Sequence, residues 1–161
     1  MAHYDIKTHK GSFHIRRATL SDVQDIVGLL RDDRLGQNRE SAQWATYESA
    51  FYDIDGDPRH FLAVVEDEAA RIVGTMQLTL IPGLSRGGST RLQIEAVRIT
   101  SSTRGTGLGT AMITWAHDYG RAHVASLVQL TTDKSRDDAI RFYTSLGYVA
   151  SHEGLKLSLE R

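Results

Sequence analysis

The chain has 161 residues, the length of one ordinary domain, since domains usually hold about 100–200 residues. Its 40% hydrophobic and 24% charged residues are typical of a globular protein and exclude a largely disordered or collagen-like chain. The 19 Lys and Arg and 20 Asp and Glu give a formal net charge of −1, so no overall field favours nucleic acid or an anionic membrane. We therefore expect one domain over residues 1–161, with no nucleic-acid or membrane partner.

Several other classes of protein are disfavoured by what the sequence lacks. It has no cysteine, which excludes a disulfide framework, a cysteine-ligated zinc site and a cysteine nucleophile. No metal-ligand spacing of histidines occurs, so we expect no metal site. No apolar run approaches the roughly 18–20 residues of a membrane span, and the first residues lack the apolar middle of a secretory signal. We expect a cytoplasmic protein.

The first third of the sequence predicts one strand and two helices. We expect residues 1–12 to be an irregular extension and residues 13–18, which alternate apolar and polar side chains, to form a strand. Thr19 and Ser21 are rival N-caps for a helix that ends near Asp33. Residues 34–43 are predicted as a loop. Both helices are predicted from apolar residues at helical spacing. These residues are Val23, Ile26, Val27 and Leu30 in the first helix and Trp44, Tyr47, Ala50 and Phe51 in the second.

Three strands follow in the middle of the chain. Residues 61–65 and 72–80 are rich in β-branched side chains and are joined by an acidic turn at 66–68, which predicts an antiparallel hairpin. After a glycine-rich loop, residues 92–99 have the pattern of another strand. The simplest arrangement of these three strands is a meander.

The last third alternates helices and strands. A helix is predicted from Leu108 to Tyr119 with Gly120 as its C-cap, followed by a strand over 127–130 that is buried on both faces. Ser135 and Asp138 have the spacing of a capping box for the next helix, which Gly147 ends. We expect two closing strands, at 148–150 and 155–159, and an exposed closing strand would allow pairing into a homodimer.

The segment from residue 94 to residue 110 carries the chemistry. It reads as strand, glycine loop and helix, and the loop is Arg104-Gly105-Thr106-Gly107-Leu108-Gly109. Glycines let the backbone approach a ligand, and the first turn of a helix offers unpaired N–H groups to a phosphate. A tight turn without a ligand is the alternative. A Walker loop would need a lysine after its last glycine, and the dinucleotide fingerprint has a different glycine spacing, so ATP and NAD are disfavoured.

This loop resembles the acetyl-CoA motif of the GNAT acetyltransferase superfamily. The resemblance extends over nearly everything after residue 13, through Ile15-Arg16-Arg17-Ala18-Thr19 with Asp22, and through Ala139-Ile140-Arg141-Phe142-Tyr143-Thr144-Ser145-Leu146-Gly147-Tyr148. It implies an α/β fold with a mixed, mainly antiparallel sheet of six or seven strands, flanked by four helices and splayed between the strands at 92–99 and 125–131. One departure is Arg136, which stands where many members have an asparagine that touches the cofactor. Arg136 is either a donor to a CoA phosphate or a surface arginine.

The same resemblance implies the residues that bind acetyl-CoA. The backbone of the glycine loop would hold the pyrophosphate, and the end of the preceding strand would pair with the pantetheine amides. For Arg104 a solvated loop arginine is the alternative. The implied cofactor-binding residues are Val97, Arg98, Ile99, Arg104, Gly105, Thr106, Gly107, Leu108, Gly109, Thr110 and Tyr143.

Two side chains are candidates for catalysis. Tyr143 resembles the tyrosine that donates a proton or hydrogen bond to the departing CoA thiolate; a core aromatic is the alternative. Glu95 is the candidate general base for the amine, on the expectation that desolvation raises its pKa; a half-exposed strand carboxylate is the alternative. His60, His152 and Glu153 would line the acceptor side.

The predicted function is direct transfer of the acetyl group from acetyl-CoA to a primary amine of a small molecule or peptide. Because the chain has no cysteine, no covalent acetyl-cysteine intermediate can form. A non-catalytic acyl-CoA-binding module would keep the glycine loop and need neither Glu95 nor Tyr143. A nucleotide-dependent enzyme would respond to NAD or ATP instead. Residues 34–60 are expected to shape the acceptor pocket, but they select no particular amine.

Overall fold

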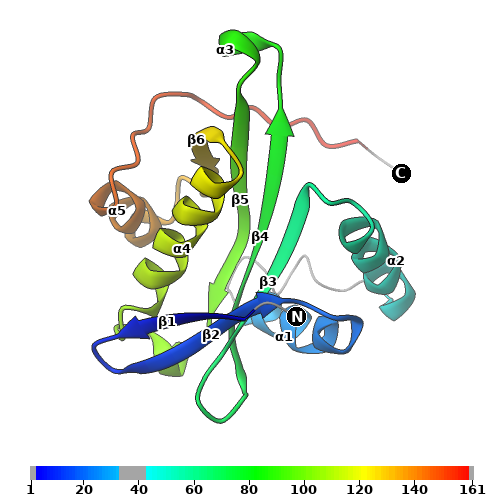
Figure 1. Cartoon of the computed structure of the whole chain (residues 1–161), viewed down its shortest axis with the longest axis vertical. Helices are drawn as coiled ribbons and strands as arrows, with labels where there is room; N and C mark the ends of the chain where they lie inside the picture. The colour runs from blue at the N-terminus through cyan, green and yellow to red at the C-terminus, as the bar shows by residue number, and fades with distance from the viewer. Residues whose placement is uncertain (1–2, 33–42, 160–161) are drawn as a thin grey trace. The chain divides into compact units, whose positions relative to one another are not determined.

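A computed structural model describes residues 3–32 and 43–159 (Figure 1). The chain divides into two compact units, the first ending at Gln129 and the second beginning at Leu130. The first unit holds the sheet and most helices, and the second holds one helix and the C-terminal segment. That the whole chain is one domain stays a prediction.

The sheet has six strands that are neighbours in chain order. The first five pair antiparallel. Ser126 Oγ donates to the Thr90 carbonyl at 3.4 Å and Gln129 Nε2 donates to Gln93 Oε1 at 2.7 Å, and the same separation of 36 residues in both contacts shows that the sixth strand runs parallel to the fifth. The predicted mixed, mainly antiparallel sheet is confirmed. Its strands are β1 (His3–Thr8), β2 (Gly11–Arg17), β3 (His60–Glu66), β4 (Ile72–Pro82), β5 (Thr90–Ile99) and β6 (Ala125–Leu130).

Strand β1 corrects the expectation that residues 1–12 are irregular. It pairs with β2 in register from His3 opposite Arg16 to Thr8 opposite Gly11. Ile6 is its buried hydrophobic residue, at 8% exposure. A strand at the edge of a sheet that buries only one side chain has almost no alternating hydrophobic pattern. The sequence pattern therefore did not predict this strand.

Five α-helices and two 3₁₀ turns lie in the described residues. The predicted helix begins at Val23 with Asp22 as its N-cap, so neither Thr19 nor Ser21 caps it. Thr19 instead caps the 3₁₀ turn that precedes the helix, and its amide donates to Asp22 Oδ2 at 2.7 Å. The first helix ends at Arg31, close to the predicted end, whereas residues 34–42 of the predicted loop lie outside the described residues. The elements are η1 (Leu20–Asp22), α1 (Val23–Arg31), α2 (Trp44–Asp55), α3 (Ser85–Gly88), η2 (Ser101–Thr103), α4 (Leu108–Ala122) and α5 (Asp137–Ser145).

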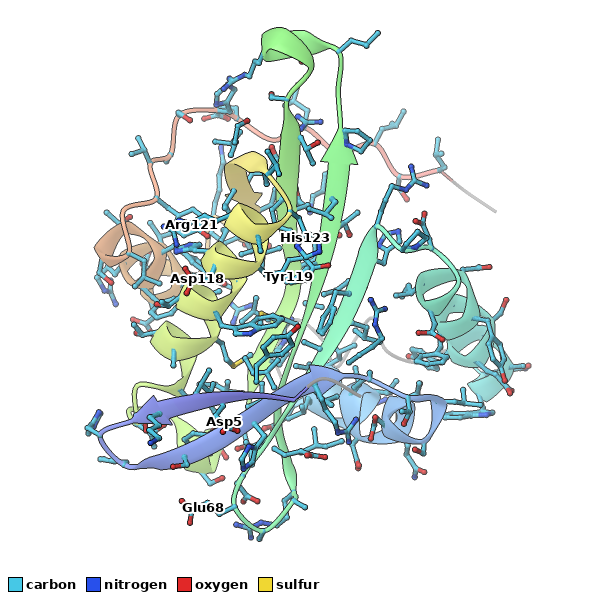
Figure 2. All side chains as sticks on the ribbon, in the orientation of Figure 1. Asp5, Glu68, Asp118, Tyr119, Arg121 and His123 are labelled. Carbon is cyan, nitrogen blue, oxygen red and sulfur yellow. The ribbon has the colours of Figure 1, made fainter. Side chains whose placement is uncertain are left out.

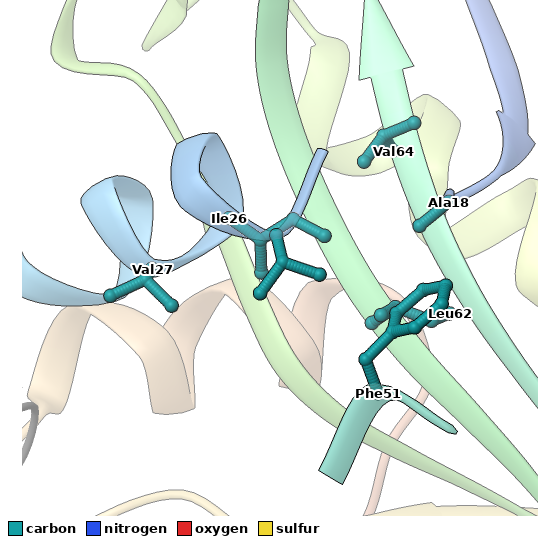
Figure 3. Close-up of a cluster of buried hydrophobic side chains, with 7 residues drawn as sticks. Ala18, Ile26, Val27, Phe51, Leu62 and Val64 are labelled. Atoms are coloured by element: carbon teal, nitrogen blue, oxygen red, sulfur yellow. The ribbon is translucent and has the colours of Figure 1, made fainter. Parts of the chain in front are cut away.

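Successive residues of β3 face two different hydrophobic layers, because side chains alternate along a strand. Leu62 and Val64 pack with Ile26 of α1 and Phe51 of α2 (Figure 3). Phe61, which precedes Leu62 and points to the opposite face, has its ring 5.5 Å from that of Trp115 and 5.4 Å from that of Tyr119 on α4. The helices α1 and α2 therefore cover one face of the sheet and α4 covers the other.

Glycines let α4 lie close to the sheet. Gly120 is buried inside α4, which continues to Ala122, so the prediction that Gly120 caps the helix is wrong. A Cβ at Gly120 would lie 3.2 Å from Leu92 Cδ2, and one at Gly74 would lie 3.3 Å from Met112 Sδ. The glycine at 120 serves packing, and this fixes α4 against β5.

An ion network joins β2, η1 and β3. Arg16 Nη1 donates to Asp22 Oδ2 at 2.6 Å, Nη2 to Asp22 Oδ1 at 3.0 Å, and Nε to Glu66 Oε1 at 2.9 Å. The three side chains are 9–15% exposed. Burial opposes the charge on Asp22, but the hydrogen bonds from Arg16 and Thr19 outweigh it and hold the pKa of that carboxyl below its usual value.

The C-terminal part of the chain, from β6 onward, differs from the sequence prediction in three places. Helix α5 begins at Asp137 with Arg136 as N-cap, and the Ser135 hydroxyl donates to Asp133 Oδ1 at 2.7 Å instead of capping, so the predicted Ser135 capping box is absent. Strand β6, predicted to be buried on both faces, has exposed residues at 126 and 127. Residues 148–150 and 155–159, predicted as closing strands, form no strand, and Leu155, Leu157 and Leu159 are each more than 80% exposed. An alternating pattern yields a strand only where another strand supplies backbone partners.

Candidate functional site

Strand β5 has a bulge shortly before its end. Gln77 of β4 lies opposite Glu95 and Thr75 opposite Arg98, so β5 has one residue more than β4 over this stretch. Ala96 takes the strain, with φ of +52°, which an L-residue seldom adopts. A bulge bends a strand and changes the direction of the groups beyond it. It therefore sets how the half-buried residues Val97, Arg98 and Ile99 are presented.

The bulged end of β5 also extends past the contacts with β6. Those contacts lie at Thr90 and Gln93, and the same register places the end of β6 opposite Ile94. Beyond that point β5 continues to Ile99 beside β4. That the sheet splays between β5 and β6 stays a prediction.

A short braced loop connects β5 to α4. The Thr100 amide donates to the Val73 carbonyl at 2.8 Å, which ties the loop to β4. Thr106 Oγ1 donates to the Thr103 carbonyl at 2.7 Å and accepts from the Leu108 amide at 3.3 Å. These bonds hold the loop in one conformation, and the sequence analysis had given Thr106 no such role.

Two glycines of the loop adopt left-handed backbone. Gly105 has φ of +71° and Gly107, the N-cap of α4, has φ of +85°. A Cβ at Gly105 would meet nothing within 4 Å, whereas one at Gly107 would lie 3.3 Å from His9 Nδ1 in the β1–β2 turn. The sequence analysis missed this neighbour, since nothing in the polar turn marks it as close to residue 107.

The first turn of α4 has free hydrogen-bond donors. Leu108 donates to Thr106, and the Ala111 amide donates to the Gly107 carbonyl at 3.0 Å. Between them, the amides of Gly109 and Thr110 have no partner among residues 3–32 and 43–159. Two adjacent free amides at the positive end of a helix, next to glycines without side chains, fit a phosphate group.

The three arginines considered for cofactor binding differ in their exposure and in the unit that holds them. Arg98 is half-buried, and its Nη1 donates to the Val97 carbonyl at 2.7 Å. Arg104 is exposed at the start of the glycine loop. Arg136, in the second unit, is half-buried at the start of α5.

Glu95 lies on β5 immediately before the bulge. Its register partner is Gln77, and its side chain is exposed. The sequence analysis expected a carboxylate removed from water, and the structure does not bury it. A role as base therefore depends on geometry and not on burial.

Tyr143 lies on α5, within the second unit. It is half-buried, with its ring 5.1 Å from that of Phe142 and 5.6 Å from that of Tyr148. Burial, with a smaller contribution from Tyr143, raises the pKa of the Tyr148 phenol to about 12. Tyr148 therefore stays protonated at neutral pH.

The predicted acceptor-side residues are divided between the two units. In the first unit, His60 Nδ1 lies 3.0 Å from Thr79 Oγ1. In the second, His152 Nδ1 lies 2.8 Å from Ser151 Oγ, and Lys134 Nζ donates to Glu153 Oε2 at 3.0 Å. Residues 34–42, expected to shape the acceptor pocket, lie outside the described residues.

The part of the chain that the structure describes was also searched for metal clusters and membrane-spanning helices. No cluster of three or more His, Asp or Glu side chains there is arranged to hold a metal ion. None of the helices there is long and apolar enough to cross a membrane.

Two curated proteins resemble parts of this chain. A glucosamine 6-phosphate N-acetyltransferase of Trypanosoma brucei brucei is 35% identical over 89 residues, which are 55% of this chain and 58% of that protein. An aminoalkylphosphonate N-acetyltransferase of Salmonella typhimurium is 35% identical over 60 residues, which are 37% of this chain and 39% of that protein. The matched stretch thus spans less than two thirds of either relative.

A solved structure matches nearly the whole chain. A protein of Bacillus halodurans C-125, described as a transcriptional regulator, has a TM-score of 0.85 and 42% identity, and the match covers 90% of this chain and 98% of that one. The sequence also matches the Acetyltransferase (GNAT) family over residues 23–148, a range that includes the bulge, the braced glycine loop and all of α5. Family membership implies an acyl-CoA donor. The chain belongs to the GNAT family of acetyltransferases.

Proposed function

We propose that this acetyltransferase uses acetyl-CoA as its donor and transfers the acetyl group directly to a primary amine of a small molecule or peptide. The observation that carries the choice of donor is the pair of free amides at Gly109 and Thr110, beside the left-handed glycines 105 and 107. The backbone of residues 104–110 would hold the pyrophosphate. Val97, Arg98 and Ile99, beyond the bulge, would offer main-chain groups to the pantetheine amides.

The reaction requires one proton to leave the amine and one to reach the sulfur. The lone pair of the neutral amine attacks the thioester carbonyl carbon, the C–S bond then breaks, and the electron pair leaves with sulfur. We assign Tyr143 as the donor of a proton or hydrogen bond to the departing thiolate. We assign Glu95, directly or through water, as the acceptor of the proton from the amine.

The relatives suggest where to look for the acceptor. Their names describe acetylation of glucosamine 6-phosphate and of aminoalkylphosphonates. Both substrates combine an amine with an anionic phosphorus group. An acceptor screen should therefore begin with amines that carry a phosphate or phosphonate, with polyamines, amino acids and peptide N-termini as the other groups.

The donor is tested by thermal unfolding of the protein with acetyl-CoA, CoA, NAD and ATP in parallel. A ligand at 100 times its Kd stabilises a protein by about 2.7 kcal/mol, and each kcal/mol shifts the Tm by roughly 2–4 °C for a domain of this size. We expect a shift of several degrees with acetyl-CoA and CoA. A shift with NAD or ATP alone would overturn the assignment of the donor.

The role of Tyr143 is tested by Tyr143→Phe, which removes the hydroxyl and keeps the ring. We expect kcat to fall by roughly 100-fold or more, the usual size of a lost general acid, while the Kd of acetyl-CoA is unchanged. Phe142→Leu, a change to the adjacent aromatic residue, is the control for packing. Unchanged turnover in Tyr143→Phe would show that Tyr143 only packs.

The role of Glu95 is tested by the pH profile of Glu95→Gln. A glutamine at this exposed position keeps the shape of the side chain but accepts no proton. The limb of the pH profile of kcat/KM that reports the general base should therefore disappear. Glu68→Gln, an exposed carboxylate on the β3–β4 turn, is the matched control. A profile of the same shape as wild type would remove Glu95 as the base.

A further inference from the structure

A row of polar side chains crosses the sheet on the face where α1 and α2 pack. His60 of β3 lies on this face, because it is two residues from Leu62, which packs with those helices. Thr79 of β4 is the register partner of both His60 and Gln93 of β5, and directly opposite residues share a face. Gln129 of β6 joins through its bond to Gln93. These four half-buried residues of the first unit, His60, Thr79, Gln93 and Gln129, form the polar row.

The opposite face of the sheet is apolar at the same level. Phe61, Leu78 and Ile94 are each next in sequence to a member of the polar row, and all three are at most 8% exposed. Their side chains point to the face that α4 covers, and Figure 2 shows Tyr119 and His123 on that helix. The polar row, by contrast, is half-exposed, so α1 and α2 leave it partly open to solvent.

Hydrogen bonds within the polar row hold its side chains in two pairs. His60 Nδ1 lies 3.0 Å from Thr79 Oγ1, and Gln129 Nε2 donates to Gln93 Oε1 at 2.7 Å. Such bonds fix the side-chain rotamers before a ligand arrives. Amide and hydroxyl groups both donate and accept hydrogen bonds, and one bond uses only part of that capacity. The polar row therefore offers ordered donors and acceptors, and it contains no carboxylate, arginine or lysine.

The proposed general base lies beside the polar row. Glu95 is two residues from Gln93 on β5, and its register partner on β4 is Gln77. Residues two apart on a strand point to the same face and lie about 7 Å apart. Among residues 3–32 and 43–159, neither the Gln77 nor the Glu95 side chain makes a hydrogen bond or an ion pair. An amine held at Glu95 is therefore next to the amide of Gln77 and about 7 Å from the polar row.

We propose that the polar row binds hydroxyl groups of the acceptor, which is then an amine with several hydroxyl groups, as in an amino sugar or an amino polyol. This inference rests on the proposed function, because it takes Glu95 as the place of the amine. Hydroxyl groups both donate and accept, as the side chains of the polar row do. A phosphate is bound best by arginine or lysine, and a second ammonium group by carboxylates, which the row lacks. An amine without hydroxyl groups would displace water from the row without replacing its hydrogen bonds.

The test measures KM and kcat of Gln93→Leu on pairs of acceptors that have the same formal charge and differ in hydroxyl groups. One pair is glucosamine and cyclohexylamine, and the other is glucosamine 6-phosphate and 6-aminohexyl phosphate. The variant is compared with wild type on the same acceptor, so differences in amine basicity cancel. We expect the KM of the hydroxylated acceptor to rise roughly fivefold, the usual size of one hydrogen bond, with kcat retained. The kcat/KM of the acceptor without hydroxyl groups should not fall.

Two further variants sharpen this test. Thr79→Val keeps the shape of the side chain and removes the hydroxyl, so it should raise the KM of the hydroxylated acceptors in the same way. Gln24→Leu, at an exposed position on α1, makes the same chemical change as Gln93→Leu outside the polar row and should leave all four acceptors unaffected. Urea unfolding of each variant verifies that the fold is intact.

The outcomes separate this inference from the proposed function. If Gln93→Leu and Thr79→Val have the same effect, or none, on both members of a pair, the polar row does not bind hydroxyl groups and the inference is overturned. It is also overturned if acetyl-CoA raises the Tm but wild type acetylates only the acceptors without hydroxyl groups, or none of the four. If acetyl-CoA does not raise the Tm, the proposed donor itself is wrong, and the inference fails with it.

Discussion

Two regions of the first unit differ in whether side chains or the main chain supply their important features. At the junction of β2, η1 and β3, the largely buried side chains of Arg16, Asp22 and Glu66 are joined by ion pairs. In the segment from Ala96 to Thr110, the important features are main-chain conformations and free amides, and several of the side chains are exposed or absent. The junction is therefore sensitive to removal of a side chain, and the loop is sensitive to addition of one.

The largest expected effect is at the junction. Asp22→Ala leaves the buried guanidinium of Arg16 with Glu66 alone, and breaking a buried ion pair in this way costs about 3–5 kcal/mol of unfolding free energy. Urea unfolding measures the loss. Asp118→Ala removes the exposed partner of Arg121 and should cost far less, since exposed pairs contribute little. Equal losses of unfolding free energy in the two variants would show that the ion pairs at the junction stabilise the fold no more than an exposed pair does.

The same junction predicts a loss of stability in acid. The pKa of Asp22 is lower in the folded protein than its ordinary value, so its contribution is fully present above that ordinary value. It is lost as the pH falls through the folded pKa. The difference in unfolding free energy between wild type and Asp22→Asn should therefore shrink as the pH falls below about 4. A difference that is constant down to pH 2 would rule out this linkage.

A smaller effect is expected from adding a methyl group to the loop. Gly105→Ala and Gly107→Ala each force a non-glycine residue into left-handed backbone, at about 1–2 kcal/mol. Gly107→Ala should cost more, because His9 must also move, whereas the space around Gly105 is open. Urea unfolding and the Kd of acetyl-CoA measure both changes. A greater loss in Gly105→Ala would mean that the contact with His9 has no influence on the loop.

The smallest effect is expected where a loop side chain acts on the backbone. Thr106→Val removes the bonds to the Thr103 carbonyl and the Leu108 amide, but water can replace them at this half-exposed position, so about 1 kcal/mol should be lost. Thr114→Val, at an exposed position on α4, is the control. If Thr106→Val is as harmful as Asp22→Ala, the loop depends on its side chains as much as the junction does.

Much of the fold was predictable from local patterns. The meander of β3, β4 and β5, the helix α4 and the place of the glycine loop all follow from periodicity and glycine spacing, which are properties of neighbouring residues. The edge strand β1 was not predictable, because Ile6 is its one buried hydrophobic residue. The closing strands at 148–150 and 155–159 were predicted from alternation alone and are absent, since alternation does not supply a pairing partner.

The candidate site was predictable to the same extent. Motif spacing placed the glycine loop between β5 and α4, and the role of Tyr143 stays a prediction. The brace at Thr106 and the approach of His9 to Gly107 depend instead on hydrogen bonding and on strand pairing. Likewise Gly120 looked like a helix end, and only its contact with Leu92 shows that it serves packing.

The sequence by itself determined the family, the order of most elements and the loop where a phosphate can bind, because each depends on residues close together in the chain. The tertiary structure decided which segments far apart in sequence meet. Pairing of β1 with β2 brings His9, in the turn between these strands, to Gly107 at the start of α4, about 100 residues later in the chain. This contact is set by the backbone hydrogen bonds between β1 and β2 and not by any local pattern, and it places His9 of the N-terminal hairpin against the glycine loop.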